Sequence, residues 1–187
     1  MNSKLQIISG RFHGRKLYLP RNARPTQNRA REALFNIISS SLFNFGDSFT
    51  VWDAFAGSGA FGIEFLSRYP DVKVIFTDVD SDSINTVRKN LALLEIGPSA
   101  IVEQTDALQA VKKYGTISDI IFVDSPYDMA DIGVAFVRAL TRRVNIGAFL
   151  IWEQEAEKAQ EPPRGWEVLK DKKYGRARFL ILRRVGE

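Results

Sequence analysis

Between residues 50 and 153 the chain alternates short apolar runs with longer amphipathic segments, and this alternation limits the fold more than any other feature. Strands that alternate with helices form a mostly parallel sheet with helices on its faces. We expect strands over residues 50–55, 72–78, 100–105, 120–123 and 148–153. The helices are expected over 60–69, from 81 to about 94 and over 131–143. After a break at 161–165, residues 166–170 and 178–183 predict a terminal antiparallel hairpin. The predicted class is therefore α/β.

The first strand leads into a glycine-rich turn, Asp53-Ala54-Phe55-Ala56-Gly57-Ser58-Gly59. Glycine suits a turn where a Cβ would obstruct a ligand or strain the backbone, and a parallel sheet places such a turn at its ligand-binding edge. A carboxylate at Asp53 would repel a pyrophosphate, but it would favour the cationic amino group and sulfonium of S-adenosylmethionine. We therefore predict S-adenosylmethionine as the cofactor. Its expected contacts are Asp53, Phe55, Gly57, Ser58, Gly59, Asp78, Val79, Asp106 and Ala107.

Two other interpretations of this turn remain open. Residues 57–62 also fit G-x-G-x-x-G, and Asp78 follows Gly57 by 21 residues, which is close to the spacing of a dinucleotide site. An NAD-dependent oxidoreductase is thus an alternative. The other is a tight strand-to-helix turn without a ligand, because glycine-rich turns are common.

Carboxylates also follow the next two predicted strands. Asp78 ends the second strand, where it would accept hydrogen bonds from both ribose hydroxyls. Asp80 is the alternative for this role, although it would equally favour the N-terminus of the next helix, whose expected N-cap is Ser81. Asp106 follows the third strand, where it would either accept from the adenine amino group or only cap the strand end.

The apolar run 120–123 is typical of a strand buried on both faces, and it ends in Asp124-Ser125-Pro126-Tyr127. The exocyclic amine of a nucleobase is a poor nucleophile because its lone pair is delocalised into the ring. The Asp124 carboxylate and the Ser125 carbonyl would accept hydrogen bonds from its two N–H groups and free that lone pair. Tyr127 would stack on the base, while Pro126 would stiffen the turn. We predict that these four residues are catalytic, although the tetrad alone would be read as a turn.

Basic residues are concentrated at the two ends of the chain. Residues 1–31 carry eight Lys or Arg and no acidic residue, residues 164–184 have a net charge of +6, and residues 32–163 have a net charge of −9. Such a distribution favours a polyanion held by both ends, whereas the alternative is a solvated basic surface. RNA contacts are expected at Arg11, His13, Arg15, Lys16, Arg24, Thr26, Arg29, Arg31, Lys173, Tyr174 and Arg176.

The length of 187 residues predicts one domain core. Residues 1–20 are expected to form a β-hairpin with Gly10 and Gly14 near its turn, followed by a helix over 27–42 that Thr26 caps. We divide the chain into a basic RNA-binding extension, 1–42, and a methyltransferase domain, 43–187. The chain has no cysteine and a single histidine, so we expect no disulfide and no metal site. Without a leader or a long apolar run, we expect a cytoplasmic monomer with no membrane contact.

Several stretches together carry a family resemblance. They are Ile7-Ile8-Ser9-Gly10, Gly14-Arg15-Lys16-Leu17, Arg24-Pro25-Thr26, residues 29–36, residues 53–62, the tetrad 124–127 and Lys173-Tyr174-Gly175. On these, the chain resembles the bacterial 16S rRNA guanine N2-methyltransferases, the small-subunit rRNA methyltransferase D type of class I S-adenosylmethionine-dependent methyltransferase. The resemblance implies a Rossmann-like, seven-stranded sheet with a terminal antiparallel hairpin. It also implies methyl transfer to N2 of a guanine, with 16S rRNA in the small ribosomal subunit or its assembly intermediate as partner.

The resemblance has one departure, at Ser125, where the family usually has a proline. The change removes a fixed φ and adds an N–H, so a looser turn is expected. The tetrad specifies an amine rather than a named base, so an amino-group methyltransferase acting on another RNA or DNA base remains an alternative. A non-catalytic RNA-binding assembly factor is a further one.

Overall fold

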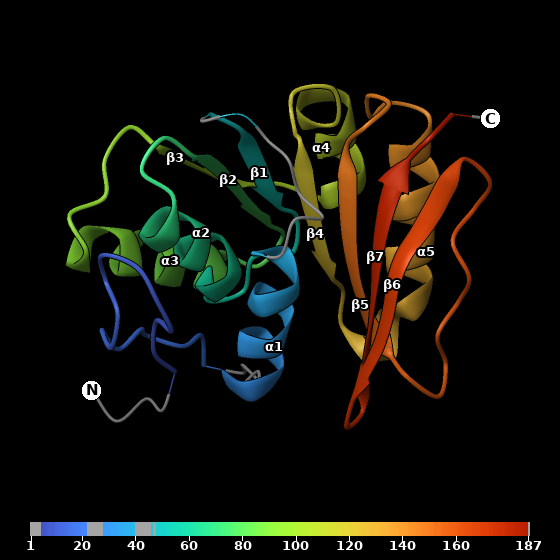
Figure 1. Cartoon of the computed structure of the whole chain (residues 1–187). Coiled ribbons are helices and arrows are strands. Elements are labelled where there is room, and N and C mark those ends of the chain that lie inside the picture. The colour runs from blue at the N-terminus through green and yellow to red at the C-terminus, as the bar shows by residue number, and fades with distance from the viewer. Residues whose placement is uncertain (1–4, 22–27, 40–45, 47, 187) are drawn as a thin grey trace.

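The computed structural model describes residues 5–21, 28–39, 46 and 48–186, with the side chains of residues 28 and 29 left out. Within these residues the fold is a seven-stranded sheet flanked by helices (Figure 1). The strands are β1 (Thr50–Asp53), β2 (Lys73–Asp78), β3 (Ala100–Gln104), β4 (Ile120–Asp124), β5 (Phe149–Glu155), β6 (Trp166–Tyr174) and β7 (Ala177–Arg184). The helices are α1 (Asn28–Ile38), α2 (Ala60–Arg68), α3 (Ser81–Leu93), α4 (Ala107–Tyr114) and α5 (Ala130–Thr141), with a 3-10 turn, η1 (Tyr127–Met129), before α5.

The strand order is β3-β2-β1-β4-β5-β7-β6. The first five strands are parallel, and β7 is antiparallel to both β5 and β6, so β6 runs in the same direction as β4 and β5. This arrangement confirms the predicted α/β class, the mostly parallel seven-stranded sheet and its terminal antiparallel hairpin. It differs from the 3-2-1-4-5-6 order of the dinucleotide-binding fold, because an antiparallel strand lies between β5 and β6.

Two apolar clusters cover the two faces of the sheet. Ile120 and Phe122 of β4 belong to the cluster that contains α1, α2 and α3, whereas Ile121 and Val123 belong to the cluster formed with α4 and α5. Successive side chains of a strand point to opposite faces, so a strand between two helical layers has to be apolar throughout. The run 120–123 therefore lies buried on both faces, as predicted.

The N-terminal segment 5–19, here called the arm, packs on α2 and α3 (Figure 1). Glu64 of α2 accepts hydrogen bonds from the backbone N–H groups of Ile8 and Ser9, both at 2.9 Å. Gly10 has φ +84° and lies so close to α2 that a Cβ would come within 2.0 Å of the Ser67 carbonyl oxygen. The arm is thus held by the core helices, and Leu5, Ile7 and Leu17 are buried in the same apolar cluster.

Several element predictions need correction. The hairpin expected over 1–20 forms only in part. Residues 5–7 and 14–17 pair through three backbone hydrogen bonds and the bridge between Gln6 and Lys16, while the N–H groups of Ile8 and Ser9 bond to Glu64 of α2. The helix α4 was not predicted, and α3 is capped by Asp80 rather than Ser81. The helix α1 ends at Ile38, earlier than residue 42. The predicted cap Thr26 lies outside the described residues.

Candidate functional site

The glycine loop joins β1 to α2 at the edge formed by the carboxyl ends of the parallel strands, here called the carboxyl edge. Gly57 and Gly59 have φ values of +53° and +76°, a region that side chains rarely adopt. Gly62 has a different role, because a Cβ there would lie 2.3 Å from the ring of Phe76. The first two glycines therefore shape the loop, and the third allows α2 to pack against β2.

Asp53 closes β1 beneath this loop and is 1% exposed. Its Oδ2 accepts a hydrogen bond from the backbone N–H of Gly62 at 3.1 Å, whereas its Oδ1 is buried and has no hydrogen-bond partner among the described residues. Burial raises the pKa of Asp53 well above its usual value, and the negative charges of Asp124 and Asp78 raise it further. A cation beside Oδ1 would satisfy this buried oxygen and favour the ionised carboxylate. The residues present thus fit a ligand with a positive group.

Asn90 connects the glycine loop to the arm, and sequence reasoning missed it. The side chain is fully buried in α3, and its Nδ2 donates to the carbonyl oxygens of Ser58 and Tyr18 at 2.9 and 3.1 Å. Its Oδ1 accepts from the backbone N–H of Tyr18 at 2.7 Å. A buried amide that uses both donors and its acceptor fixes the groups that it contacts. The sequence does not indicate this role of Asn90, because its hydrogen-bond partners are backbone atoms of Tyr18 and Ser58, which are distant in the chain.

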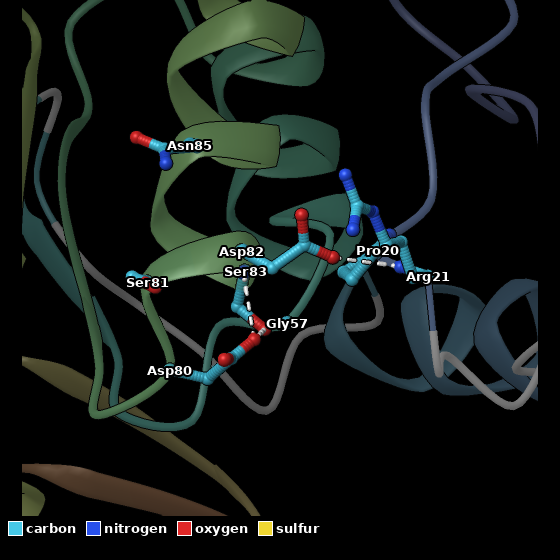
Figure 2. Close-up of a pocket in the computed structure, with 8 residues that line it drawn as sticks. All are labelled: Pro20, Arg21, Gly57, Asp80, Ser81, Asp82, Ser83 and Asn85. Atoms are coloured by element: carbon cyan, nitrogen blue, oxygen red, sulfur yellow. Dashed lines mark hydrogen bonds between the residues drawn. The ribbon is translucent and has the colours of Figure 1, made fainter.

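A pocket of about 500 Å³ lies next to the loop, between the start of α3 and the end of the arm (Figure 2). It is lined by Pro20, Arg21, Gly57, Asp80, Ser81, Asp82, Ser83 and Asn85. The backbone N–H of Arg21 donates to Asp82 at 2.8 Å, so the chain that follows the arm closes one side of the pocket. Neither Asp78 nor the tetrad is among the lining residues.

The carboxylates at the strand ends have distinct partners. Asp78 accepts from the backbone N–H groups of Gly57 and Asp80, both at 2.9 Å. Asp80 caps α3 by accepting from the N–H of Ser83 at 2.8 Å, and Asp106 caps α4 by accepting from the N–H of Gln109 at 3.1 Å. Asp80 and Asp106 are thus helix caps in addition to any contact with a ligand.

The other predicted cofactor contacts differ in exposure. The ring of Phe55 packs edge-on against Phe136, with 5.5 Å between the ring centroids. Val79 is 69% exposed, whereas Ala107 is buried at the start of α4. Phe55 is half-buried, so Phe55 and Val79 are both accessible to a ligand, whereas Ala107 is not.

The tetrad begins at the last residue of β4, at the same edge, and its first and last residues lie next to a carboxylate that sequence reasoning missed. Asp124 pairs in register with Glu153 of β5. Tyr127 donates its hydroxyl hydrogen bond to Glu153 Oε1 at 3.0 Å. Burial raises the pKa of Asp124 to about 7 and, together with the charge of Asp124, raises the pKa of Glu153 to about 9. The sequence could have indicated Glu153, because it ends a predicted strand. Its closeness to Asp124 and Tyr127 is visible only from the register between β4 and β5.

Ser125, where the family usually has proline, is 5% exposed. It lies directly against Gly133 of α5, where a Cβ would come within 2.4 Å of the Ser125 Oγ. A proline at this position would restrain the turn by fixing its backbone φ angle. Here the packing of Ser125 against Gly133 restrains the turn instead.

The predicted RNA contacts fall into two groups that lie apart. Arg11, His13, Arg15 and Lys16 are exposed in the arm. Arg15 donates to the carbonyl of Leu93, the last residue of α3. This helix is 13 residues long and begins at the carboxyl edge, so its far end lies roughly 18 Å from that edge. Lys173, Tyr174 and Arg176 are instead at the turn between β6 and β7, at the carboxyl edge itself.

Arg31 needs correction as an exposed RNA contact. Its side chain is 4% exposed, and its Nη2 donates to the backbone carbonyl of Gln6. The guanidinium thus joins α1 to the arm inside the protein. Arg24 and Thr26 lie outside the described residues, and of Arg29 only the backbone, in α1, is described.

Two further features concern metals and membranes. The described residues contain no group of three or more His, Cys, Asp or Glu side chains arranged to hold a metal ion. No described helix combines the length and the apolar character that crossing a membrane requires.

Comparisons with known proteins agree on one family. The sequence profile described as "Conserved hypothetical protein 95" matches residues 5–183. "Ribosomal RNA small subunit methyltransferase D" of Buchnera aphidicola subsp. Acyrthosiphon pisum is 33% identical over 175 residues, which are 91% of this chain and 88% of that protein. "Putative rRNA methyltransferase YlbH" of Bacillus subtilis is 40% identical over 128 residues, 66% of this chain and 67% of that protein. Among solved structures, "Putative methyltransferase yhhF from Escherichia coli" has a TM-score of 0.83 and 30% identity, covering 98% of this chain and 99% of that one.

Proposed function

The chain belongs to the Conserved hypothetical protein 95 family, together with the ribosomal RNA small subunit methyltransferases D, and from this membership we propose its reaction. It transfers a methyl group from S-adenosylmethionine to the exocyclic N2 of a guanine in 16S rRNA. The observation that carries the proposal is the placement of Asp53 and Asp124 on the neighbouring strands β1 and β4. The glycine loop and the tetrad therefore meet at one edge of the sheet, where one would hold the donor and the other the acceptor.

The donor side uses residues of β1, β2 and the glycine loop. S-adenosylmethionine, when bound, supplies an electrophilic methyl group on a sulfonium. Asp53 would hold a cationic group of the donor through its buried Oδ1, which has no other partner among the described residues. Asp78 would bind the ribose and at the same time hold Gly57 in place. The pocket beside Gly57 and Asp80 supplies the adjoining space.

The acceptor side uses the tetrad. A nitrogen that gains a methyl group has to lose a proton, and the Asp124 carboxylate would accept it. The Ser125 carbonyl would accept a hydrogen bond from the second N–H of the amine and so favour a nitrogen whose lone pair is free. Tyr127 would stack on the guanine, and Glu153 would hold the tyrosine ring through the hydroxyl. The buried position of Glu153 and its raised pKa suit a carboxyl group that stays protonated and adds no negative charge next to Asp124.

The test begins with the donor. S-adenosylmethionine should raise the Tm of the protein, whereas NAD should leave it unchanged, because a ligand that binds only the folded state stabilises it. Labelled methyl should then pass from S-adenosylmethionine to small ribosomal subunits that lack this modification. The Asp124→Asn variant should bind the donor and transfer no label. Stabilisation by NAD alone, or equal transfer by Asp124→Asn, would overturn the proposal.

A further inference from the structure

A groove of about 430 Å³ lies between α1 and β6, apart from the pocket beside Gly57 and Asp80. It is lined by Ala33, Asn36, Ile37, Lys170, Lys172 and Tyr174. Asn36 and both lysines are exposed, whereas Tyr174 is half-buried. The groove therefore has two ammonium groups, an amide and an aromatic ring, and its apolar lining comes from Ala33 and Ile37.

The strand register connects this groove to the proposed catalytic carboxylate. Asp124 pairs with Glu153, Glu153 pairs with Phe179 on β7, and Phe179 pairs with Lys172 on β6. Neighbouring strands are about 4.8 Å apart, so the backbone of Lys172 lies roughly 14 Å from that of Asp124. Register partners share a face, and Phe179 is buried in the cluster that also contains residues of α1. The groove thus lies on the face toward which Asp124 projects, and it opens near the carboxyl edge.

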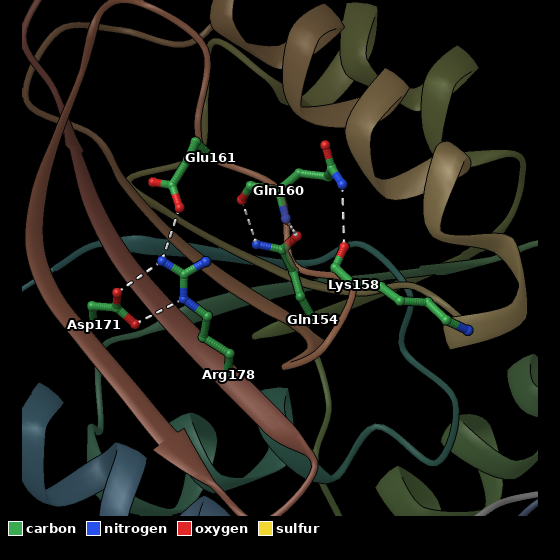
Figure 3. A network of polar contacts seen from close by, with 6 residues as sticks. All are labelled: Gln154, Lys158, Gln160, Glu161, Asp171 and Arg178. Atoms are coloured by element: carbon green, nitrogen blue, oxygen red, sulfur yellow. Dashed lines mark hydrogen bonds and ion pairs between the residues drawn. The ribbon is translucent and has the colours of Figure 1, made fainter.

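The acidic residues of β6 do not neutralise the groove. Asp171 lies on the opposite face and accepts two hydrogen bonds from Arg178, at 2.9 and 2.8 Å, while Glu161 accepts a third from the same guanidinium at 3.0 Å (Figure 3). Glu167 pairs with Arg183 near the other end of the strand. Within the part of the chain that the structure describes, neither Lys170 nor Lys172 forms an ion pair. Their charges are therefore available to an anion.

We propose that the groove between α1 and β6 binds the single-stranded RNA that flanks the target guanine. The inference rests on the proposed function. Lys170 and Lys172 contact phosphates, and Tyr174 provides an aromatic face on which a flanking base stacks. The ring of Tyr174 is itself supported by Phe179, with 6.0 Å between the ring centroids. An RNA strand occupies both the tetrad and this groove, because both open on the same face near the same edge.

The experiment compares three proteins, the wild type, Lys170→Ala/Lys172→Ala and a matched control, Lys73→Ala/Lys112→Ala. The control also removes two exposed lysines, at the start of β2 and on α4, which lies on the other face. Methyl transfer to small ribosomal subunits is measured at several salt concentrations. The groove variant should raise KM about tenfold. It should also flatten the slope of log(kcat/KM) against log salt by about 1.4, because each lost single-strand phosphate contact removes about 0.7.

Tyr174 gives an independent arm of the test. Tyr174→Ala should raise KM, and Tyr174→Phe should restore it to near the wild-type value, because phenylalanine keeps the stacking face. A groove variant whose KM and salt slope equal those of the control would overturn the inference. A Tyr174→Ala variant that matches the wild type would overturn the stacking role.

Binding of a single-stranded RNA oligonucleotide with one guanine, followed by fluorescence anisotropy, separates this inference from the proposed function. If only the groove variant loses oligonucleotide binding, the proposed RNA contact is supported by a measurement that does not depend on methyl transfer. Absence of methyl transfer by the wild type overturns the proposed function instead. Equal oligonucleotide affinity in all three proteins, with normal turnover, overturns the proposal that the groove binds RNA.

Discussion

The carboxylate of Asp78 accepts a hydrogen bond from the backbone N–H of Gly57 at 2.9 Å. The last residue of β2 therefore holds the first glycine of the loop that follows β1. The second oxygen of Asp78 accepts from the N–H of Asp80 at 2.9 Å, which fixes the approach to α3. One side chain thus shapes both walls of the site in which the donor is proposed to bind.

Replacing Asp78 by alanine should raise the Kd for S-adenosylmethionine by at least tenfold, because the variant loses the proposed ribose contact and loosens Gly57. Isothermal titration calorimetry measures this change. Asp80→Ala is the control, since Asp80 caps α3 through Ser83. It should cost about 1 kcal/mol of stability, seen as a lower Tm, with little change in Kd. A larger loss of affinity in Asp80→Ala than in Asp78→Ala would transfer the ribose role to Asp80.

The pH dependence of turnover follows from Asp124. Burial raises its pKa to about 7, and the carboxyl group has to be ionised to accept a proton from the amine. The rate constant kcat should therefore rise as pH increases through about 7. A profile of kcat against pH from 5.5 to 8.5, with saturating substrates, measures it. A kcat that does not change across this pH range would show that Asp124 does not accept the proton.

The ionised carboxylate of Asp124 should lower the stability of the folded protein, and this loss should grow as pH rises. An acid whose folded pKa is raised binds more protons in the folded state than in the unfolded state, so stability falls as pH rises between the unfolded value and about 7. At pH 8, Asp124→Asn should consequently have a Tm equal to or above that of the wild type, while losing turnover. A strongly lowered Tm would show that the carboxylate serves the fold.

The pair formed by Tyr127 and Glu153 should be coupled in catalysis. Tyr127→Phe keeps the ring and removes the hydroxyl, and Glu153→Leu removes the acceptor, so each should lower kcat several-fold. Glu153→Gln keeps an acceptor oxygen and should retain most of the activity. Because both single changes break the same hydrogen bond, the double variant Tyr127→Phe/Glu153→Leu should lose little more than either alone. Losses of kcat that multiply in the double variant would show that the two residues act independently.

Arg31 should matter for stability. Its buried guanidinium donates to the Gln6 carbonyl between α1 and the arm, so Arg31→Ala should lower the free energy of unfolding by about 1–3 kcal/mol. Arg88→Ala, an exposed change on α3, should stay within about 0.5 kcal/mol of the wild type. Urea denaturation measures both. Equal stabilities, together with weaker RNA binding by Arg31→Ala, would return Arg31 to the RNA-contacting surface.

The central sheet was predictable because its local signals agree. The apolar run 120–123 is short and lies before a turn, which favours a strand covered on both faces over a buried helix, and Gly57 and Gly59 mark the turn between strand and helix. The helix α4 was missed, although Ala107, Ala110, Val111 and Tyr114 lie on one buried face. Its eight residues give a periodic signal too short to distinguish from the end of the preceding strand.

The remaining features depend on tertiary contacts that no local pattern contains. Glu153 faces Tyr127 only because β5 pairs with β4 in one register. The glycines of the arm mark a turn, and residues 5–7 do pair with 14–17 around it, but the pairing stays short because Glu64 of α2 accepts from the N–H groups of Ile8 and Ser9. Arg31 looked like part of an exposed basic segment, because charge in a sequence does not reveal which side of a helix meets the core.

The most direct test of the proposed reaction is the identity of the methylated nucleoside. Small ribosomal subunits that lack the modification are incubated with the protein and labelled S-adenosylmethionine, and their RNA is digested to nucleosides and analysed by mass spectrometry. We predict label in N2-methylguanosine from the wild type and none from Asp124→Asn. Label in any other nucleoside, or no label despite measured donor binding, would rule out methyl transfer to N2 of guanine.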